Sequence, residues 1–146
     1  MRGKDNKPHF HVTAGLIRLE GKLLITKRPR GSHMEGLWEF PGGKQEKGET
    51  LKECLEREIE EELGIKVRAE KLLSTIDYEY ENRFISLHIF QCLYLAGQPE
   101  PLENQEIIFV HPEDLAQYRF PPPDQKVIQT LSLHSFKTPL PLDPKT

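Results

Sequence analysis

The chain has 146 residues, a formal net charge of −3 and two cysteines. This length suits one domain with its own core, and two thiols at this separation form neither a disulfide framework nor a zinc pattern. The mild acidity argues against broad contact with a nucleic-acid polymer, which usually requires a basic face. We also find no signal-peptide core and no apolar run of about 20 residues, so we expect a cytoplasmic protein without a membrane segment.

We predict a single domain over residues 1–146. Its core runs from about 9 to 134, and the polar or proline-rich ends, 1–8 and 137–146, are expected to be loose tails. Five stretches of the core combine β-branched or aromatic residues with flanking turn residues, which is the pattern of strands. They are residues 11–19, 23–26, 72–80, 84–95 and 106–110.

Two helices are predicted between and after these strands. From Thr50 to Leu63 apolar residues recur every four positions, and Gly64 ends the pattern, which indicates an amphipathic helix. Asp124 follows three prolines and precedes an apolar segment, so we predict that it is the N-cap of a second helix. The alternation of strands and helices favours the α/β (α+β) class, with a mixed sheet between helices.

The first predicted helix is strongly acidic, because five of the seven positions from Glu56 to Glu62 are glutamate. At about 100° per residue, Glu58, Glu61 and Glu62 fall within one arc of about 100° beside the apolar stripe. A solvated helix face is the simpler interpretation, but like charges four residues apart repel each other. Three carboxylates beside a buried stripe therefore indicate a cation, and oxygen ligands indicate Mg²⁺ or Mn²⁺.

A glycine-containing loop precedes this helix and permits a tight turn or a close approach of backbone to a ligand. Loop and helix together resemble the Nudix box with every position filled. A chance match to the fixed identities has a probability on the order of 10⁻⁸ per start site. The matching residues are Gly43, Glu49, Arg57, Glu58, Ile59, Glu61, Glu62, Gly64 and Ile65.

Segments outside the box are similar to the MutT-type nucleotide-pool branch of this family, and the resemblance extends over residues 10–134. It implies an α/β/α sandwich and an enzyme that hydrolyses a nucleoside triphosphate to a nucleoside monophosphate and pyrophosphate, with Mg²⁺ or its substitute Mn²⁺. A non-catalytic Nudix-like recognition module is an alternative that predicts an eroded box and a companion domain. The similar segments are 25–28, 33–34, 39–43, 78–80, 82–83 and 120–122.

The resemblance also implies a set of metal ligands. By their match to the box, Glu58, Glu61 and Glu62 are expected to ligate the metal directly or through water. The Gly42 carbonyl is expected to add a ligand, and Glu106 an oxygen from a neighbouring loop.

Three glutamates are candidates for the general base. Glu58 is the first choice by family analogy, with Glu106 and Glu49 as alternatives, because related enzymes differ in this role. Arg57 is expected to pair with Glu49 and so to fix the loop against the helix. A plain structural salt bridge explains that pair equally well.

A nucleotide-binding surface is implied as well. Arg28 matches a family position that contacts phosphate, and Arg83 and His33 are further candidates. An ordinary surface role would explain all three without a ligand. We expect the wall and the edge for the base to come from one segment, Glu39, Phe40, Pro41 and Gly42.

Asp124 is the residue expected to distinguish between bases. MutT-like enzymes that prefer 8-oxoguanine typically have asparagine here, which donates and accepts, whereas an ionised aspartate only accepts. The cytosine-nucleotide branch resembles this sequence in having aspartate, although helix capping alone also explains the residue. We therefore expect 8-oxo-dGTP as the first substrate and cytosine nucleotides as the alternative, hydrolysed by a monomer or weak dimer.

Overall fold

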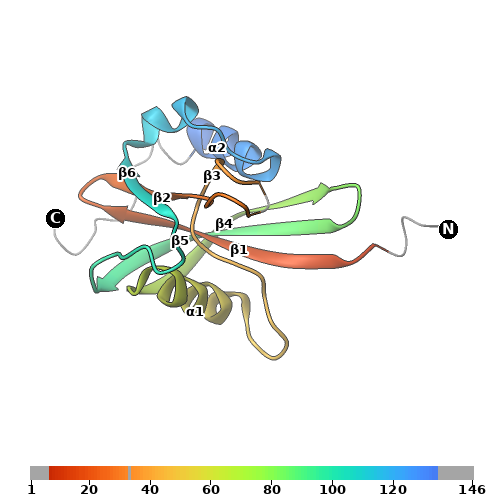
Figure 1. The fold of residues 1–146 in the computed structure, drawn as a ribbon, viewed down its shortest axis with the longest axis horizontal. Coiled ribbons are helices and arrows are strands. Elements are labelled where there is room, and N and C mark those ends of the chain that lie inside the picture. The colour runs from red at the N-terminus through yellow and green to blue at the C-terminus, as the bar shows by residue number, and fades with distance from the viewer. Residues whose placement is uncertain (1–6, 33, 135–146) are drawn as a thin grey trace.

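The computed structural model describes residues 7–32 and 34–134, and it places one sheet between helices (Figure 1). The first half of the chain forms three strands and a helix. The second half forms two long strands, one short strand, a 3₁₀ helix and a final helix. In chain order the elements are β1 His9–Leu19, β2 Lys22–Lys27, β3 Trp38–Glu39, α1 Leu51–Leu63, β4 Lys66–Glu79, β5 Phe84–Ala96, β6 Glu106–Val110, η2 Pro112–Gln117 and α2 Pro122–His134.

The six strands form a mixed sheet in the order β3-β2-β1-β5-β4, with β6 also paired to β2. β1 and β5 run parallel over a long register that starts at His9 opposite Phe84. All other pairs are antiparallel. The prediction of a mixed sheet is therefore confirmed, and β1 is its central strand.

Helix α1 covers one face of the sheet, and its ends match the sequence prediction (Figure 1). Thr50 and Glu53 form a reciprocal capping box that satisfies free backbone N–H groups at the first turn. Gly64 ends the helix with a φ of 70°, a left-handed conformation that glycine adopts without a steric penalty. The buried stripe of α1 packs against the sheet as one core cluster, whose members include Leu55, Ile59, Leu63, Ile17, Leu24, Val67 and Phe90.

Helix α2 and η2 cover the opposite face, which completes the α/β/α sandwich (Figure 1). The predicted N-cap role of Asp124 is wrong, because α2 begins at Pro122 and Asp124 lies in its first turn. The Pro121 carbonyl accepts the bond from Gln125 N. Prolines fit the start of a helix because the first N–H groups have no intrahelical partner. The Asp124 side chain is thereby free to serve a site.

One strand is longer in the structure than predicted, and two short elements were not predicted from the sequence. β4 starts at Lys66 instead of residue 72, because Val67 and Ala69 pack against α1, and register shifts between Ala69 and Ser74 interrupt the alternation. β3 has only two residues, and η2 is a short 3₁₀ helix, so neither shows a period. Within the described residues, no helix has the length and apolar character needed to span a bilayer.

Candidate active site

The glycine loop lies along the edge of β1. Thr13 N donates to the Gly43 carbonyl and Gly15 N to the Pro41 carbonyl, both at 2.8 Å. The two carbonyls on either side of Gly42 thus face β1, and in an extended segment the carbonyl between them faces away. A side chain on Gly42 would overlap the Thr13 carbonyl, so only glycine allows this approach.

Gly43 brings the same loop against α1. A Cβ added at Gly43 would overlap the carboxyl group of Glu58. The loop backbone and this glutamate are therefore in direct contact, although they are 15 positions apart in the numbering of the chain. The box residues therefore form one surface, made of the glycine-loop backbone and the carboxylates of α1.

Arg57 ties the loop to the helix, as the sequence predicted. Its Nε and Nη2 donate to both carboxylate oxygens of Glu49, at 2.9 and 2.7 Å. Its Nη1 also donates to Glu58 at 3.1 Å and to Glu61 at 3.2 Å. The hydrogen bonds from Arg57 lower the pKa of Glu49 to about 2. A carboxyl with so low a pKa is a weak base.

This pair predicts an acid-dependent contribution to stability. Because the pKa of Glu49 is lower in the folded protein than the ordinary 4.5, its contribution is complete above pH 4.5 and disappears as the pH falls towards about 2. We expect Glu49→Gln to unfold more readily than wild type at pH 7, and the gap to close across that window. Urea unfolding at several pH values measures it. Glu70→Gln, which removes only an exposed pair with Arg68, should show little gap at any pH.

Glu58 and Glu62 share a hydrogen bond one helical turn apart. Burial raises the pKa of both carboxyls above the usual range, and repulsion from Glu39 and Glu103 adds to the shift at Glu62. The pair therefore holds a proton that a cation would displace. Two carboxylates this close repel each other when no cation is bound. Their oxygens are the ligands that a hard divalent ion such as Mg²⁺ prefers.

The glutamates expected to ligate the metal do not point to one common centre in this conformation. Among the residues that the structure describes, no three His, Cys, Asp or Glu side chains converge as a metal-binding group. Glu58 and Glu61 are turned towards Arg57, and the Glu61 side chain is 55% exposed. Of the three glutamates expected to ligate the metal, Glu62 alone lines a cavity of about 310 Å³, together with Gly42 and Gly43.

The structure places Glu106 in a different hollow from Glu62, so a metal contact by Glu106 stays a prediction. Glu106 starts β6 opposite Lys27 and lines a neighbouring hollow with Arg30. Glu103 lines the cavity of Glu62 instead. Gln105 fixes this loop, because its Nε2 donates to the Glu62 carbonyl at 3.1 Å and its Oε1 accepts from Glu103 N at 2.9 Å. The segment between Ala96 and β6 shows no helical or strand pattern of apolar residues, so nothing in the sequence indicated this placement.

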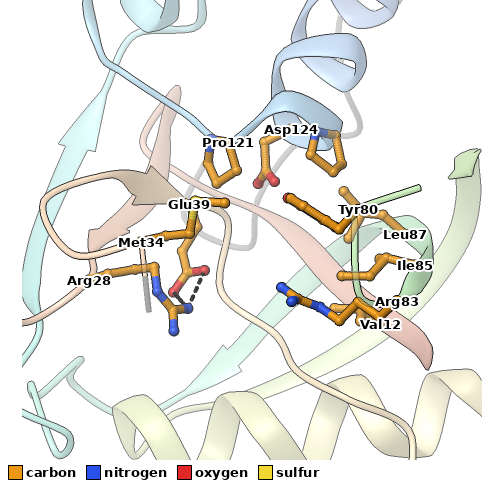
Figure 2. Close-up of a pocket in the computed structure, with 11 residues that line it drawn as sticks. Val12, Arg28, Met34, Glu39, Tyr80, Arg83, Ile85, Leu87, Pro121 and Asp124 are labelled. Carbon is orange, nitrogen blue, oxygen red and sulfur yellow. Dashed lines mark hydrogen bonds and ion pairs between the residues drawn. The ribbon is translucent and has the colours of Figure 1, made fainter. Parts of the chain in front are cut away.

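A second cavity of about 150 Å³ adjoins the first (Figure 2). On one side Arg28 donates to both oxygens of Glu39, at 3.0 and 3.2 Å. On the other side the Arg83 guanidinium lies 4.6 Å from the centre of the Tyr80 ring. Arg28, Glu39 and Asp124 line both cavities, together with Val12 and Leu87 from the sheet.

Asp124 points into this space and is only 8% exposed (Figure 2). Burial and repulsion from Glu39 raise its pKa to about 8, although a hydrogen bond from the Phe40 backbone acts in the opposite direction. The carboxyl is thus mostly neutral at pH 7. A neutral carboxyl donates through its O–H and accepts through its other oxygen, which the expectation of an ionised, accept-only aspartate did not include.

The segment expected to supply the wall and edge for the base is largely buried in the structure. The Phe40 ring is 3% exposed and stacks on Phe120 with centroids 5.4 Å apart, so it packs in the core. Phe40 also lines the cavity of Glu62, and its backbone hydrogen-bonds to Asp124. Pro41 is buried, with its carbonyl turned to β1. His33 lies outside the described residues.

Tyr80 and Met34 lie in segments that resemble the MutT branch, but neither side chain was predicted from the sequence to have a role in the pocket. Tyr80 supplies an aromatic wall from the end of β4, and Met34 lines the opposite rim (Figure 2). The aromatic pair Tyr78 and Tyr80 at the end of a strand was the available signal for the first. A lone methionine in a loop gives no such signal.

An acidic helix, a bare glycine loop and two flanking arginines define a hydrolase site for an anionic substrate handled with a divalent ion. The chain belongs to the NUDIX domain family, whose match covers residues 12–130. Members of this family are hydrolases that generally use a divalent metal, typically Mg²⁺.

Curated relatives agree with this assignment. The chain is 35% identical over 120 residues to the CTP pyrophosphohydrolase of Escherichia coli, covering 82% of this chain and 89% of that protein. It is 36% identical over 134 residues to the 8-oxo-dGTP diphosphatase of Haemophilus influenzae, covering 90% and 98%. The solution structure of the E. coli ORF135 protein matches with a TM-score of 0.79 and 31% identity, covering 92% of this chain and 96% of that one.

Proposed function

We propose that the protein is a Mg²⁺-dependent nucleoside triphosphate pyrophosphohydrolase that releases a nucleoside monophosphate and pyrophosphate, with 8-oxo-dGTP as the leading substrate. The observation that carries this proposal is the pair of adjoining cavities that share Arg28, Glu39 and Asp124. One cavity contains the Glu62 carboxylate and the glycine loop, and the other contains apolar walls and a buried hydrogen-bonding group. A substrate with a phosphate chain at one end and a base at the other fits both.

The carboxylates would hold the metal and the phosphate end of the substrate. Glu62 and Glu58 would release their shared proton to solvent as the ion takes its place. The Gly42 carbonyl would add a ligand from the loop that lines the same cavity, and Glu61 and Glu103 would add outer oxygens. When bound, Mg²⁺ neutralises phosphate charge and makes the attacking water more acidic. Arg28 lines both cavities and can pair with phosphate oxygens. Arg83 lines only the second cavity, where the base would lie.

Glu58 remains the first choice for the general base. It contacts the glycine loop beside the expected metal site, whereas Arg57 holds Glu49 at a pKa of about 2, which makes Glu49 a weak base. Glu106 lines a different hollow. Arg57 is then a positioning residue that keeps Glu58 against the glycine loop.

Asp124 supports the choice of 8-oxoguanine. Guanine presents two acceptors, O6 and N7, on one edge, whereas oxidation at C8 turns N7 into an N–H donor. A neutral carboxyl can donate to O6 and accept from that N–H at the same time. A cytosine nucleotide is the second candidate substrate, because the Asp124 carboxyl can also accept from the N4 amino group, and one relative is named for CTP.

A substrate panel tests the proposal directly. Purified protein with Mg²⁺ should release pyrophosphate, and no orthophosphate, from 8-oxo-dGTP with a higher kcat/KM than from dGTP, CTP or 5-methyl-dCTP. Equal rates across the panel would contradict a base-reading role for the pocket. A rate that is highest for the cytosine nucleotides would establish the alternative. We further propose that the protein works in the cytoplasm, as a monomer or weak dimer, which gel filtration coupled to light scattering can check.

A further inference from the structure

Three histidines gather on the sheet at a site that the hydrolase mechanism does not use. His9 and His11 are two residues apart on β1, so their side chains share a face, and His88 lies on the adjacent strand β5. The rings of His9 and His11 stack with centroids 4.7 Å apart, and those of His11 and His88 at 5.2 Å. Both β1 histidines are exposed and His88 is half-buried, so the cluster is open to solvent.

The ring nitrogens of this cluster face one another. Nδ1 of His11 and Nε2 of His88 are 3.0 Å apart. Nδ1 of His88 is 3.1 Å from the Thr75 hydroxyl on β4. Either partner can donate in the hydrogen bond between His88 Nδ1 and the Thr75 hydroxyl. With Nδ1 as the donor, Nε2 keeps a lone pair, the arrangement usual for metal-ligating histidines.

We propose that His11 and His88 form a binding site for a borderline transition-metal ion, with Zn²⁺ as the reference ion and water completing the coordination. Two imidazole nitrogens on a tetrahedral Zn²⁺ with bonds of about 2.0–2.1 Å are about 3.3 Å apart. The observed pair needs to open by only about 0.3 Å by that measure. Two protein ligands are proposed because no three candidate ligands of the described chain already converge.

The surrounding residues favour a cation at this point. His9 Nε2 is 2.7 Å from the Ser86 hydroxyl, which donates to Asp77 at 2.6 Å. This chain brings a carboxylate to the edge of the cluster without occupying the facing nitrogens of His11 and His88. Asp77 can therefore stabilise a bound ion through water.

The site is chemically separate from the glutamate site. Imidazole nitrogens select zinc, nickel and copper ions, whereas carboxylates and carbonyls suit Mg²⁺. It is nevertheless connected to the glycine loop, because the His11 carbonyl accepts from Gln45 N at 2.8 Å and Thr13 N donates to the Gly43 carbonyl. An ion on His11 and His88 would crosslink β1 to β5. The glycine loop is hydrogen-bonded to the same part of β1.

Calorimetric titration of the full-length protein with Zn²⁺, in excess Mg²⁺ to fill the glutamate site, tests the proposal. Wild type should bind Zn²⁺, and His11→Gln and His88→Gln should each weaken binding by about tenfold or more, since each removes one of two ligands. The matched control is His111→Gln, at the start of η2 and outside the cluster, which should bind as wild type does.

Thermal unfolding supplies a readout that is independent of hydrolysis. Zn²⁺ should raise the melting temperature of wild type and of His111→Gln but not that of the two cluster variants. Circular dichroism confirms that each variant is folded. Zn²⁺ affinity that is unchanged in both cluster variants, or no Zn²⁺ binding by wild type in Mg²⁺, would overturn the proposal and leave the hydrolase assignment unaffected.

Discussion

Glu62→Gln is expected to lower hydrolysis about a thousandfold while making the metal-free protein more stable. The loss of activity follows because charge stabilisation by a bound divalent ion is worth several kcal/mol in the transition state. The gain in stability follows because burial and neighbouring carboxylates raise the pKa of Glu62 in the folded protein. Its contribution to stability is present below pH 4.5 and is lost as the pH rises. The amide cannot ionise and avoids this cost.

At pH 8 without metal, we expect Glu62→Gln to increase the free energy of unfolding by about 1–2 kcal/mol. Added Mg²⁺ should stabilise wild type and leave the variant unchanged, because only wild type gains a ligand. Glu60→Gln is the control on the same helix, since Glu60 is exposed and pairs with the exposed Lys66. A Glu62→Gln protein that kept Mg²⁺-dependent pyrophosphate release would refute the metal assignment.

The second large effect concerns pH and the choice of base. Because the pKa of Asp124 is raised to about 8, its neutral form dominates below that pH and its accept-only form above it. The ratio of kcat/KM for 8-oxo-dGTP to that for dCTP should therefore fall as the pH rises through about 8. The expected fall is about 10- to 100-fold, since a matched bidentate contact is worth about 1–3 kcal/mol. Taking a ratio cancels pH effects on the glutamates, which act on both substrates.

Asp124→Asn isolates this effect. The amide donates and accepts at every pH, so the variant should keep a constant ratio where that of wild type changes. Asp114→Asn should follow wild type, because Asp114 lies on η2, accepts a hydrogen bond from Gln117 and lines neither cavity. If Asp124→Asn and wild type gave the same pH profile, the residue would have no role in reading the base.

The fold and the catalytic half of the site could be predicted from sequence because their signals are local. The stripe of α1, the capping box and Gly64 lie within 15 consecutive positions, and the Arg57–Glu49 pair is set by helix geometry plus a short loop. The mixed sheet followed from the order of strands and helices. These features need no knowledge of distant contacts.

The second cavity is lined by four residues that were expected at the substrate half, Arg28, Glu39, Arg83 and Asp124. Their protonation and exact placement could not be predicted, because these properties come from burial between distant segments. The protonation of Asp124 depends on Glu39 and on the cover that the sheet provides. Whether Glu103 or Glu106 reaches Glu62 depends on the register of β6 against β2 and on the anchor at Gln105. The helix boundary that misplaced Asp124 was ambiguous for the same reason, since three prolines fit equally well before or inside the first turn.

The parallel pairing of β1 with β5 has a consequence for how activity appears during folding. His9 contacts Ser86 across 77 positions of the chain, and the opposite edge of β1 carries the glycine loop. Closing so long a stretch is entropically costly and slow relative to local helix formation. The acidic helix α1 can therefore form early. The glycine loop that faces it is positioned only after β1 and β5 have paired. Hydrolysis should return on refolding together with the last cooperative step, and not with the helical signal.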